Sequence, residues 1–249
     1  MTRGWDAAAY DRVSGPQAAW AEGVLERLSL RGDETVLDAG CGSGNVTQLL
    51  LDRLPRGHVV AVDSSESMVE HARGALDPER TTVFQADLAE VELDEQVDAA
   101  FSNAVFHWIP DHEALFEHLH AALRPGGRLV AQCGGKGNVA RFHAAAREVG
   151  ASEPYAPHLA DWAGPWNFAS AEETAERLER AGFTEIETWL EPYPVTPEDP
   201  PAFVRAVCLG PHLERLPEDL RDDFVHAVCK LAGTELDYVR LNIDAKKPS

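Results

Sequence analysis

Basic residues are scarce in this chain. The 249 residues include 22 Lys and Arg against 42 Asp and Glu, which gives a formal net charge of −20 at pH 7, and the basic residues are scattered. Proteins that bind nucleic acid need a basic surface to neutralise phosphates, and an anionic membrane likewise attracts polybasic segments. The composition therefore argues against nucleic acid and membranes as partners. It favours a small-molecule substrate and leaves the oligomeric state open.

Long apolar runs and closely spaced cysteines are also missing. No run of 18 apolar residues is present, so no transmembrane helix is expected, and the first residues, MTRGWD, lack the apolar stretch of a signal peptide. The four cysteines, at positions 41, 133, 208 and 229, are widely spaced and match no zinc-binding pattern. We therefore expect a cytoplasmic protein without a metal site.

Strands and helices are predicted to alternate over the first half of the chain. Such alternation is typical of a doubly wound α/β domain with a mostly parallel sheet, and a length of 249 residues suits a single domain. The predicted strands cover about 34–39, 58–63, 81–86, 97–103 and 127–133. The predicted helices cover about 17–30, 45–54, 65–76 and 111–123.

The second half of the chain is less regular. After a helix near 138–149, residues 151–168 are rich in Pro, Trp and His. They form either a lid over a small substrate or a loop folded onto its own aromatic rings. A helix over 171–182, capped by Ser170, and a strand over about 183–191 are predicted next.

Prolines then interrupt the pattern. Five prolines between residues 192 and 201 are expected to break regular structure. Two helices near 201–209 and 217–232 are predicted to form a small cap, so that cap or lid elements lie within about 151–168 and 195–232. The final run, 238–245, alternates apolar and polar residues, which predicts a strand with one covered face.

A glycine-rich turn follows the first predicted strand. Residues 36–45 read VLDAGCGSGN, so the apolar strand ends at Asp38 and a helix begins after the turn. Glycines let the backbone approach a ligand that a Cβ would exclude, and a helix N-terminus favours a carboxylate or a phosphate. The spacing G-x-G-x-G differs from the G-x-G-x-x-G of dinucleotide-binding proteins. An acidic group at this position would oppose a pyrophosphate but suits an ammonium.

A second acidic residue ends the next predicted strand. Residues 59–63 read VVAVD, so Asp63 follows Asp38 by 25 residues. A continuous apolar run indicates a strand buried on both faces, and a carboxylate at its end can accept two hydrogen bonds from ribose hydroxyls. Asp63 is therefore predicted to bind a ribose, with helix capping as the alternative role.

These two strand ends resemble motifs of the class I S-adenosylmethionine-dependent methyltransferases. Residues 38–44 match the family pattern D-x-G-C-G-x-G throughout. The resemblance implies a Rossmann-like fold with a mostly parallel seven-stranded sheet, whose last strand is antiparallel, and S-adenosylmethionine as the cofactor. It places the methionine part of the cofactor over the glycine loop. The cofactor-binding residues that it implies are Asp38, Gly40, Cys41, Gly42, Gly44, Asp63, Ser64, Met68, Ala86, Asp87, Leu88 and Asn103.

Two of these residues have specific roles in the resemblance. Met68 is expected to lie against the adenine ring, with a place in the apolar core as the alternative. Asp87, which follows the third predicted strand, is expected to take the adenine amino group.

The acceptor chemistry is expected after the fourth strand, because open α/β sheets bind ligands at the carboxyl ends of their strands. A carboxylate acceptor is already ionised at pH 7, so it needs alignment and hydrogen-bond donors rather than a base. Trp108 Nε1–H and the Gln17 amide are candidate donors, whereas His107 would be the base for a phenol or amine acceptor. Structural roles remain open for all three: core aromatic, surface helix residue, and structural or solvent-facing histidine, respectively.

The stretch 103–112, NAVFHWIPDH, together with Trp5 and Tyr10, resembles one subgroup of the family in particular. This subgroup consists of small-molecule carboxyl methyltransferases and contains trans-aconitate methyltransferase. The resemblance covers roughly residues 5–135 and implies methylation of a small acidic metabolite at a carboxylate oxygen. The alternatives are O-, N- or C-methylation of another small molecule with His107 as base, and a non-catalytic cofactor-binding protein.

Overall fold

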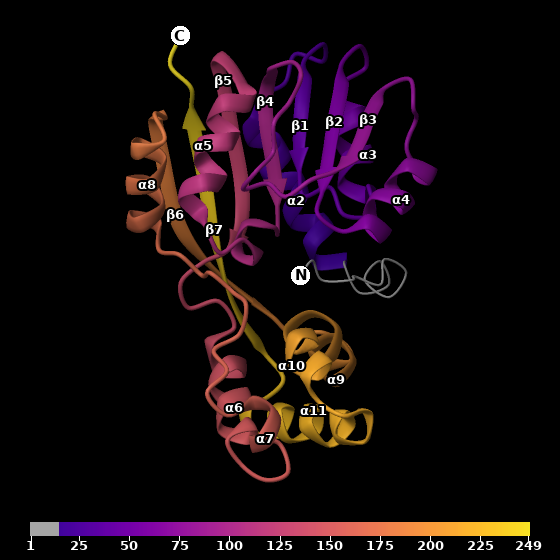
Figure 1. The fold of residues 1–249 in the computed structure, drawn as a ribbon, viewed down its shortest axis with the longest axis vertical. Coiled ribbons are helices and arrows are strands. Elements are labelled where there is room, and N and C mark those ends of the chain that lie inside the picture. The colour runs from indigo at the N-terminus through magenta and orange to yellow at the C-terminus, as the bar shows by residue number, and fades with distance from the viewer. Residues whose placement is uncertain (1–14) are drawn as a thin grey trace.

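A seven-stranded sheet forms the centre of the computed structural model, which describes residues 15–249 apart from the side chains of residues 15–19 and 206. The strand order is β3-β2-β1-β4-β5-β7-β6 (Figure 1). The first five strands pair in parallel, and β7 lies antiparallel between β5 and β6. The doubly wound fold and the antiparallel last strand are therefore confirmed. The strands are β1 (Thr35–Ala39), β2 (His58–Asp63), β3 (Thr81–Gln85), β4 (Val97–Asn103), β5 (Leu123–Gly134), β6 (Thr184–Val195) and β7 (Leu236–Lys246).

Helices cover both faces of the sheet because alternate strand residues point to opposite sides. In β1, Val36 joins an apolar cluster with α2, α3 and α4, whereas Leu37 joins a separate cluster with α5 and α8. This double coverage explains why the central strands read as continuous apolar runs. The covering helices are α2 (Gly15–Leu28), α3 (Asn45–Arg53), α4 (Glu66–Ala75), α5 (His112–Ala122) and α8 (Ala171–Arg180).

The remaining helices pack together beyond the end of the sheet at which β5 finishes, and we call them the helical lobe (Figure 1). They surround a third apolar cluster that includes Phe142 and Phe224 and also takes Trp20 from α2 and Tyr238 from β7. None of the helices in the described part of the chain is long and apolar enough to cross a membrane. The lobe consists of α6 (Ala140–Gly150), α7 (Ala156–Leu159), α9 (Pro200–Phe203), the π-helix η2 (Val204–Cys208), α10 (Gly210–Arg215) and α11 (Glu218–Ala232).

The prediction that the prolines break regular structure was wrong at two places. Strand β6 runs through Pro192 and Pro194, which oppose Val239 and Asp237 of β7. Strand β6 is the edge strand, so the backbone nitrogens of alternate residues face away from β7. Two prolines at such positions therefore remove no hydrogen bond between the strands. Pro200 and Pro201 then begin α9, because the first turn of a helix needs no N–H donor from these positions.

The prediction of one covered face for the last strand was also wrong. Arg240 and Asn242 lie on the polar side of β7, yet they are buried as deeply as Leu241 and Ile243. Arg27 of α2 donates a hydrogen bond to Asn242 Oδ1 at 2.7 Å. Helix α2 therefore covers the polar face of β7, and this burial brings Arg240 close to the functional site.

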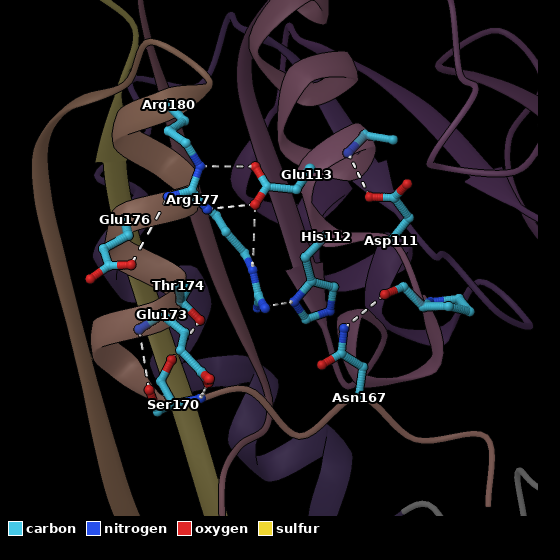
Figure 2. Close-up of polar contacts among 12 residues, drawn as sticks. Asp111, His112, Glu113, Asn167, Ser170, Glu173, Thr174, Glu176, Arg177 and Arg180 are labelled. Carbon is cyan, nitrogen blue, oxygen red and sulfur yellow. Dashed lines mark hydrogen bonds and ion pairs between the residues drawn. The ribbon is translucent and has the colours of Figure 1, made fainter.

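Helices α5 and α8 lie side by side and are joined by polar contacts (Figure 2). Ser170 caps α8 as predicted, in a capping box with Glu173. Between the helices, Glu113 accepts from Arg180 at 2.5 Å and lies 3.9 Å from Arg177. Glu113 and Arg180 are about half exposed, so this ion pair stabilises the fold only slightly.

Candidate active site

The glycine-rich loop lies between β1 and α3, at the carboxyl end of the sheet. Gly40 has φ +89°, and a Cβ at this position would lie 2.2 Å from Val105 Cγ2, a residue of the loop after β4. The Gly40 and Cys41 amides donate to the Val62 carbonyl at 2.8 and 3.0 Å. Gly40 is therefore required for the close approach of two loops, and its predicted contact with the cofactor stays a prediction.

Gly42 has the opposite surroundings. Its φ is +54°, and a Cβ there would meet no atom of the described residues within 4 Å, so these residues leave the space over the backbone open. Its amide donates to Asp63 Oδ2 at 3.0 Å. Gly42 thus presents a bare backbone to an open space beside a carboxylate, which is what the predicted cofactor loop needs.

Two carboxyl groups, Asp38 and Asp63, lie beside this loop. Asp38 is almost fully buried and accepts from Thr47 Oγ1 at 2.6 Å. Asp63 Oδ1 accepts from the Ser65 amide at 2.9 Å. Burial raises the pKa of Asp38 to about 7, and the nearby charge of Asp63 adds to the effect. Burial also raises the pKa of Asp63. A ligand that brings an ammonium to one carboxylate and hydroxyl donors to the other suits this pair of groups.

This electrostatic arrangement predicts that cofactor binding weakens in mild acid. An ammonium would pair with ionised Asp38, so affinity should be greatest well above pH 7 and be lost as the pH falls through the raised pKa of this group. We expect the affinity for S-adenosylhomocysteine to fall about tenfold between pH 7.5 and 6, because each pH unit below the pKa removes most of the binding-competent form. Calorimetric titration at several pH values measures this change in affinity. Asp38→Asn should bind weakly at every pH with no slope, and a flat profile in the wild type would contradict the pairing.

The other predicted cofactor residues divide into two groups. Ser64 and Asp87 are exposed at the ends of β2 and β3, and Asp87 Oδ1 accepts from the Ala89 amide at 3.0 Å. Cys41 and Leu88 instead belong to the two apolar clusters on opposite faces of the sheet. Only the backbones of these two residues are therefore available to a ligand, and burial raises the pKa of the Cys41 thiol, which keeps it protonated.

Four further residues complete the predicted cofactor set. Met68 is buried on α4, with 4 % of its surface exposed. Gly44, with φ +93°, precedes α3 as its N-cap. Ala86, just after β3, and Asn103, at the end of β4, are half-buried. All four positions lie at the ends of β1–β4 or on the helices that follow them, as an open α/β sheet requires of a ligand site.

The loop after β4 carries the predicted acceptor residues. Ala104 has φ +64°, an unusual conformation for a residue with a Cβ. Phe106–Trp108 then form a single 3₁₀ turn, η1. Backbone strain of this kind persists only where the surroundings fix the chain, and it is often found at functional sites.

Several contacts hold this loop in place, and Figure 2 shows two of the residues that make them, His112 and Asn167. His112 Nε2 donates to the Phe106 carbonyl at 2.9 Å, and Arg177 donates to His112 Nδ1 at 3.4 Å. On the other side, the backbone N–H of Asn167 donates to the His107 carbonyl at 2.9 Å, and its side-chain Nδ2 donates to the Pro110 carbonyl at 3.0 Å. The loop is therefore fixed both by α5 and by the segment that follows α7.

His107 is buried, with 8 % of its surface exposed. The Gly134 amide donates to its Nδ1 at 3.3 Å. Burial holds the pKa of His107 well below its ordinary value, and the positive charge of Arg240 lowers it further. The ring is therefore neutral near pH 7, and because Nδ1 accepts a hydrogen bond, its proton is on Nε2.

Trp108 and His107 line a cavity between the sheet and the helical lobe. The opposite wall consists of aromatic rings, with Trp166 6.0 Å from the Trp108 ring and stacked on Phe168 at 6.2 Å. His143 contacts Trp166 edge-on at 4.3 Å, and burial lowers the pKa of His143 to about 4. The cavity wall is thus aromatic, and its histidines are neutral.

Sequence reasoning missed most of the residues that line this cavity, among them Trp20, His143 and Arg240. Arg240 follows Asp38 by about 200 residues and lies on a strand that was expected to expose its polar face. Gln17, the third predicted catalytic residue, belongs to α2, but its side chain is outside the described part of the structure, as are Trp5 and Tyr10. Their predicted roles stay predictions.

Comparison with known sequences agrees with this site. A family model described as a methyltransferase domain matches residues 36–127, which hold the glycine loop and both acidic strand ends. A trans-aconitate 2-methyltransferase of Azoarcus sp. is 34% identical over 228 residues, covering 86% of this chain and 84% of that protein. Another of the same name, from Methylobacterium radiotolerans, is 32% identical over 229 residues and covers 90% and 86%.

Comparison with solved structures supports the same fold at lower identity. The YcgJ protein of Bacillus subtilis has a TM-score of 0.67 at 14% identity, covering 92% of this chain and 98% of that one. A Haemonchus contortus phosphoethanolamine N-methyltransferase with bound S-adenosylhomocysteine has a TM-score of 0.65 at 20% identity, covering 98% of this chain and 57% of that one. The chain has the glycine loop and the paired aspartates of the family, and its relatives match most of its length. It therefore belongs to the class I S-adenosylmethionine-dependent methyltransferases, in the subgroup of the trans-aconitate 2-methyltransferases, and its cofactor is S-adenosylmethionine.

Proposed function

We propose that this methyltransferase methylates a carboxylate oxygen of a small organic acid. The relatives that match most of its length are named for methylation of trans-aconitate, itself an organic acid. The net charge of −20 argues against a nucleic-acid acceptor. The observation that carries the proposal is the state of His107, whose neutral ring offers a hydrogen-bond donor at Nε2 rather than a base.

The residues of the site would have separate roles in binding the cofactor and in aligning the acceptor. Asp38 and Asp63 would hold the ammonium and the ribose of the cofactor, and bound S-adenosylmethionine supplies a methyl group that its sulfonium activates. His107 Nε2–H and Trp108 Nε1–H would each donate to the acceptor carboxylate and align one of its oxygens. Since a carboxylate is ionised at pH 7, no proton has to be removed, and neutral donors leave its negative charge available for reaction.

The segment over residues 162–168 and the helical lobe would act as the cap of this site. Trp166 and Phe168 of that segment form the wall opposite the sheet, and Asn167 ties it to the loop that carries His107. A closed aromatic wall excludes water and strengthens the hydrogen bonds to the acceptor. The lid alternative raised by the aromatic composition is therefore the one that we propose.

The donor role of His107 predicts a small effect of His107→Gln. A glutamine amide still donates a hydrogen bond, so turnover should fall by less than about tenfold, whereas the loss of a true base would slow it by about 10²–10⁴-fold. Trp108→Phe keeps a ring but removes a donor, so it should slow turnover more than His107→Gln does. Single-turnover rates from pH 5.5 to 9, with trans-aconitate as the first acid tested and base-labile methyl ester as the product, measure both. A steep acidic limb that disappears in His107→Gln would refute the carboxylate mechanism.

A further inference from the structure

Three aromatic side chains in the cavity wall keep part of their surface open. Trp108, Trp166 and Phe168 are half-buried, whereas Trp20 on the same wall has only 6 % of its surface exposed. Large apolar side chains that lie together in a concave site and stay partly uncovered offer apolar surface to a ligand. The acceptor is therefore expected to have an apolar part.

The open rings lie next to a donor that is proposed for the reacting carboxylate. The Phe168 ring is stacked on His107, with the ring centres 5.7 Å apart and the planes at 19°. Trp166 is stacked in turn on Phe168, at 6.2 Å and 8°. A carboxylate that accepts from His107 would therefore have Phe168 and Trp166 as the neighbours of the group attached to it. A flat apolar group extends this series of nearly parallel rings.

The polar side chains of the wall have partners within the protein. Arg240 stands opposite Glu191 in the pairing of β6 with β7, and its Nε donates to Gln132 Oε1 at 3.2 Å. Asn138 Oδ1 accepts from the Val239 amide at 3.1 Å. The described part of the wall therefore offers no spare cation for a second carboxylate, and burying a carboxylate without a partner is costly.

The histidines of the wall add no positive charge near pH 7. Burial holds the pKa of His107 well below its ordinary value and lowers the pKa of His143 to about 4. The His143 ring instead contacts Trp166 edge-on at 4.3 Å. Aromatic surface thus predominates on the side of the cavity that faces the donors, and it favours an apolar substituent on the acceptor over a charged one.

We propose that the acceptor is a monocarboxylic acid with an aromatic ring close to its carboxylate, and that this ring packs against Trp166 and Phe168, a place that we call the ring site. Because His107 adjoins Phe168, only a short link, such as the double bond of an arylacrylate, separates the ring from the carboxylate. The inference rests on the proposed carboxylate methylation and adds to it the class of acid that is methylated.

Binding without turnover tests the ring site. trans-Cinnamate and crotonate share a double bond and one carboxylate, and cinnamate has a phenyl ring where crotonate has a methyl group. Each acid, and trans-aconitate, is titrated calorimetrically into protein saturated with S-adenosylhomocysteine. Wild type should bind cinnamate about ten- to a hundredfold more tightly than crotonate, the range expected for burying the surface of a ring. It should also bind cinnamate more tightly than trans-aconitate.

Variants of Trp166 assign this preference to the ring site. Trp166→Leu should reduce the preference for cinnamate over crotonate about tenfold, because the indole that packs on the phenyl ring is lost. Trp166→Phe keeps a ring and should restore part of it. Trp189→Leu is the matched control, since Trp189 is half-buried on β6 and does not line the cavity. It makes the same exchange of side chains and should keep the full preference.

The possible results separate the ring site from the reaction. Equal binding of cinnamate and crotonate, tighter binding of trans-aconitate than of cinnamate, or an unchanged preference in Trp166→Leu would each overturn the ring site. A preference for cinnamate without methyl ester from cinnamate or trans-aconitate would sustain the ring site and count against carboxylate methylation. Methyl ester from trans-aconitate but not from cinnamate would leave the proposed function standing and refute the ring site.

Discussion

Gly40→Ala is expected to abolish measurable cofactor binding and to destabilise the fold. The new Cβ would lie 2.2 Å from Val105, and the residue would have to adopt φ +89°. Overpacking costs about 1–3 kcal/mol and a left-handed conformation about 1–2 kcal/mol, so the free energy of unfolding should fall by about 2–5 kcal/mol. Relief of the clash must move either the glycine loop or the loop of Ala104 and His107. Affinity for S-adenosylhomocysteine should then fall at least about a hundredfold, because the ligand groups on both loops lose their alignment.

Gly42→Ala is the matched control for this prediction. Its Cβ would meet no atom within 4 Å in the part of the chain that the structure describes, so the free energy of unfolding should fall by only about 1 kcal/mol, from the backbone conformation. Cofactor affinity should still fall, because the methyl group occupies the open space over the loop. Urea unfolding of both variants measures the loss of stability, and calorimetric titration measures the loss of cofactor affinity. Equal stability losses in the two variants would show that Val105 yields to the Gly40 Cβ.

Asp63→Ala is expected to weaken cofactor binding about ten- to a hundredfold. A charge-assisted hydrogen bond contributes about 1.5–3 kcal/mol, and the ribose would lose its carboxylate partner. The variant also leaves the Gly42 and Ser65 amides without the acceptor that they have in the wild type. Asp63→Asn therefore accompanies it, since the amide oxygen still accepts one of these bonds.

The expected order of the dissociation constants for S-adenosylhomocysteine is Asp63→Ala weakest, then Asp63→Asn, then wild type. Asp87→Ala provides the comparison at the end of the next strand, because Asp87 is exposed and its carboxylate accepts from the nearby Ala89 amide. Its loss should have a smaller effect on both binding and stability. An unchanged dissociation constant in Asp63→Ala would show that the ribose lies elsewhere.

The cofactor half of the site could be predicted because its signals are local. The glycine spacing and the acidic ends of β1 and β2 lie within one stretch, 38–63, and the topology of a parallel sheet brings consecutive strand ends together. Even there, sequence could not separate Gly40 from Gly42. Both are glycines of one motif, but only the structure shows that Val105 excludes a Cβ at one position and that open space surrounds the other.

The acceptor half could not be predicted in the same way. Its cavity combines Trp20, His107, Trp166 and Arg240, four positions spread over most of the chain. The alternation in β7 indicated an exposed polar face, but no local pattern shows that α2 packs over it. Arg240 therefore had the sequence signature of a solvated residue and is in fact buried. Pro192 and Pro194 were misread for a related reason, since only the strand order identifies β6 as an edge.

This division of the site has a consequence for how the enzyme can diverge. The residues predicted to bind the cofactor all lie within residues 38–103, whereas the cavity wall combines the loop after β4 with the first described helix, the aromatic segment and the last strand. Substitutions at positions such as 166, 168 or 240 can change which acid is accepted without altering the glycine loop. Laboratory evolution toward new acceptors should therefore randomise these distant wall positions and leave the predicted cofactor-binding residues within 38–103 intact.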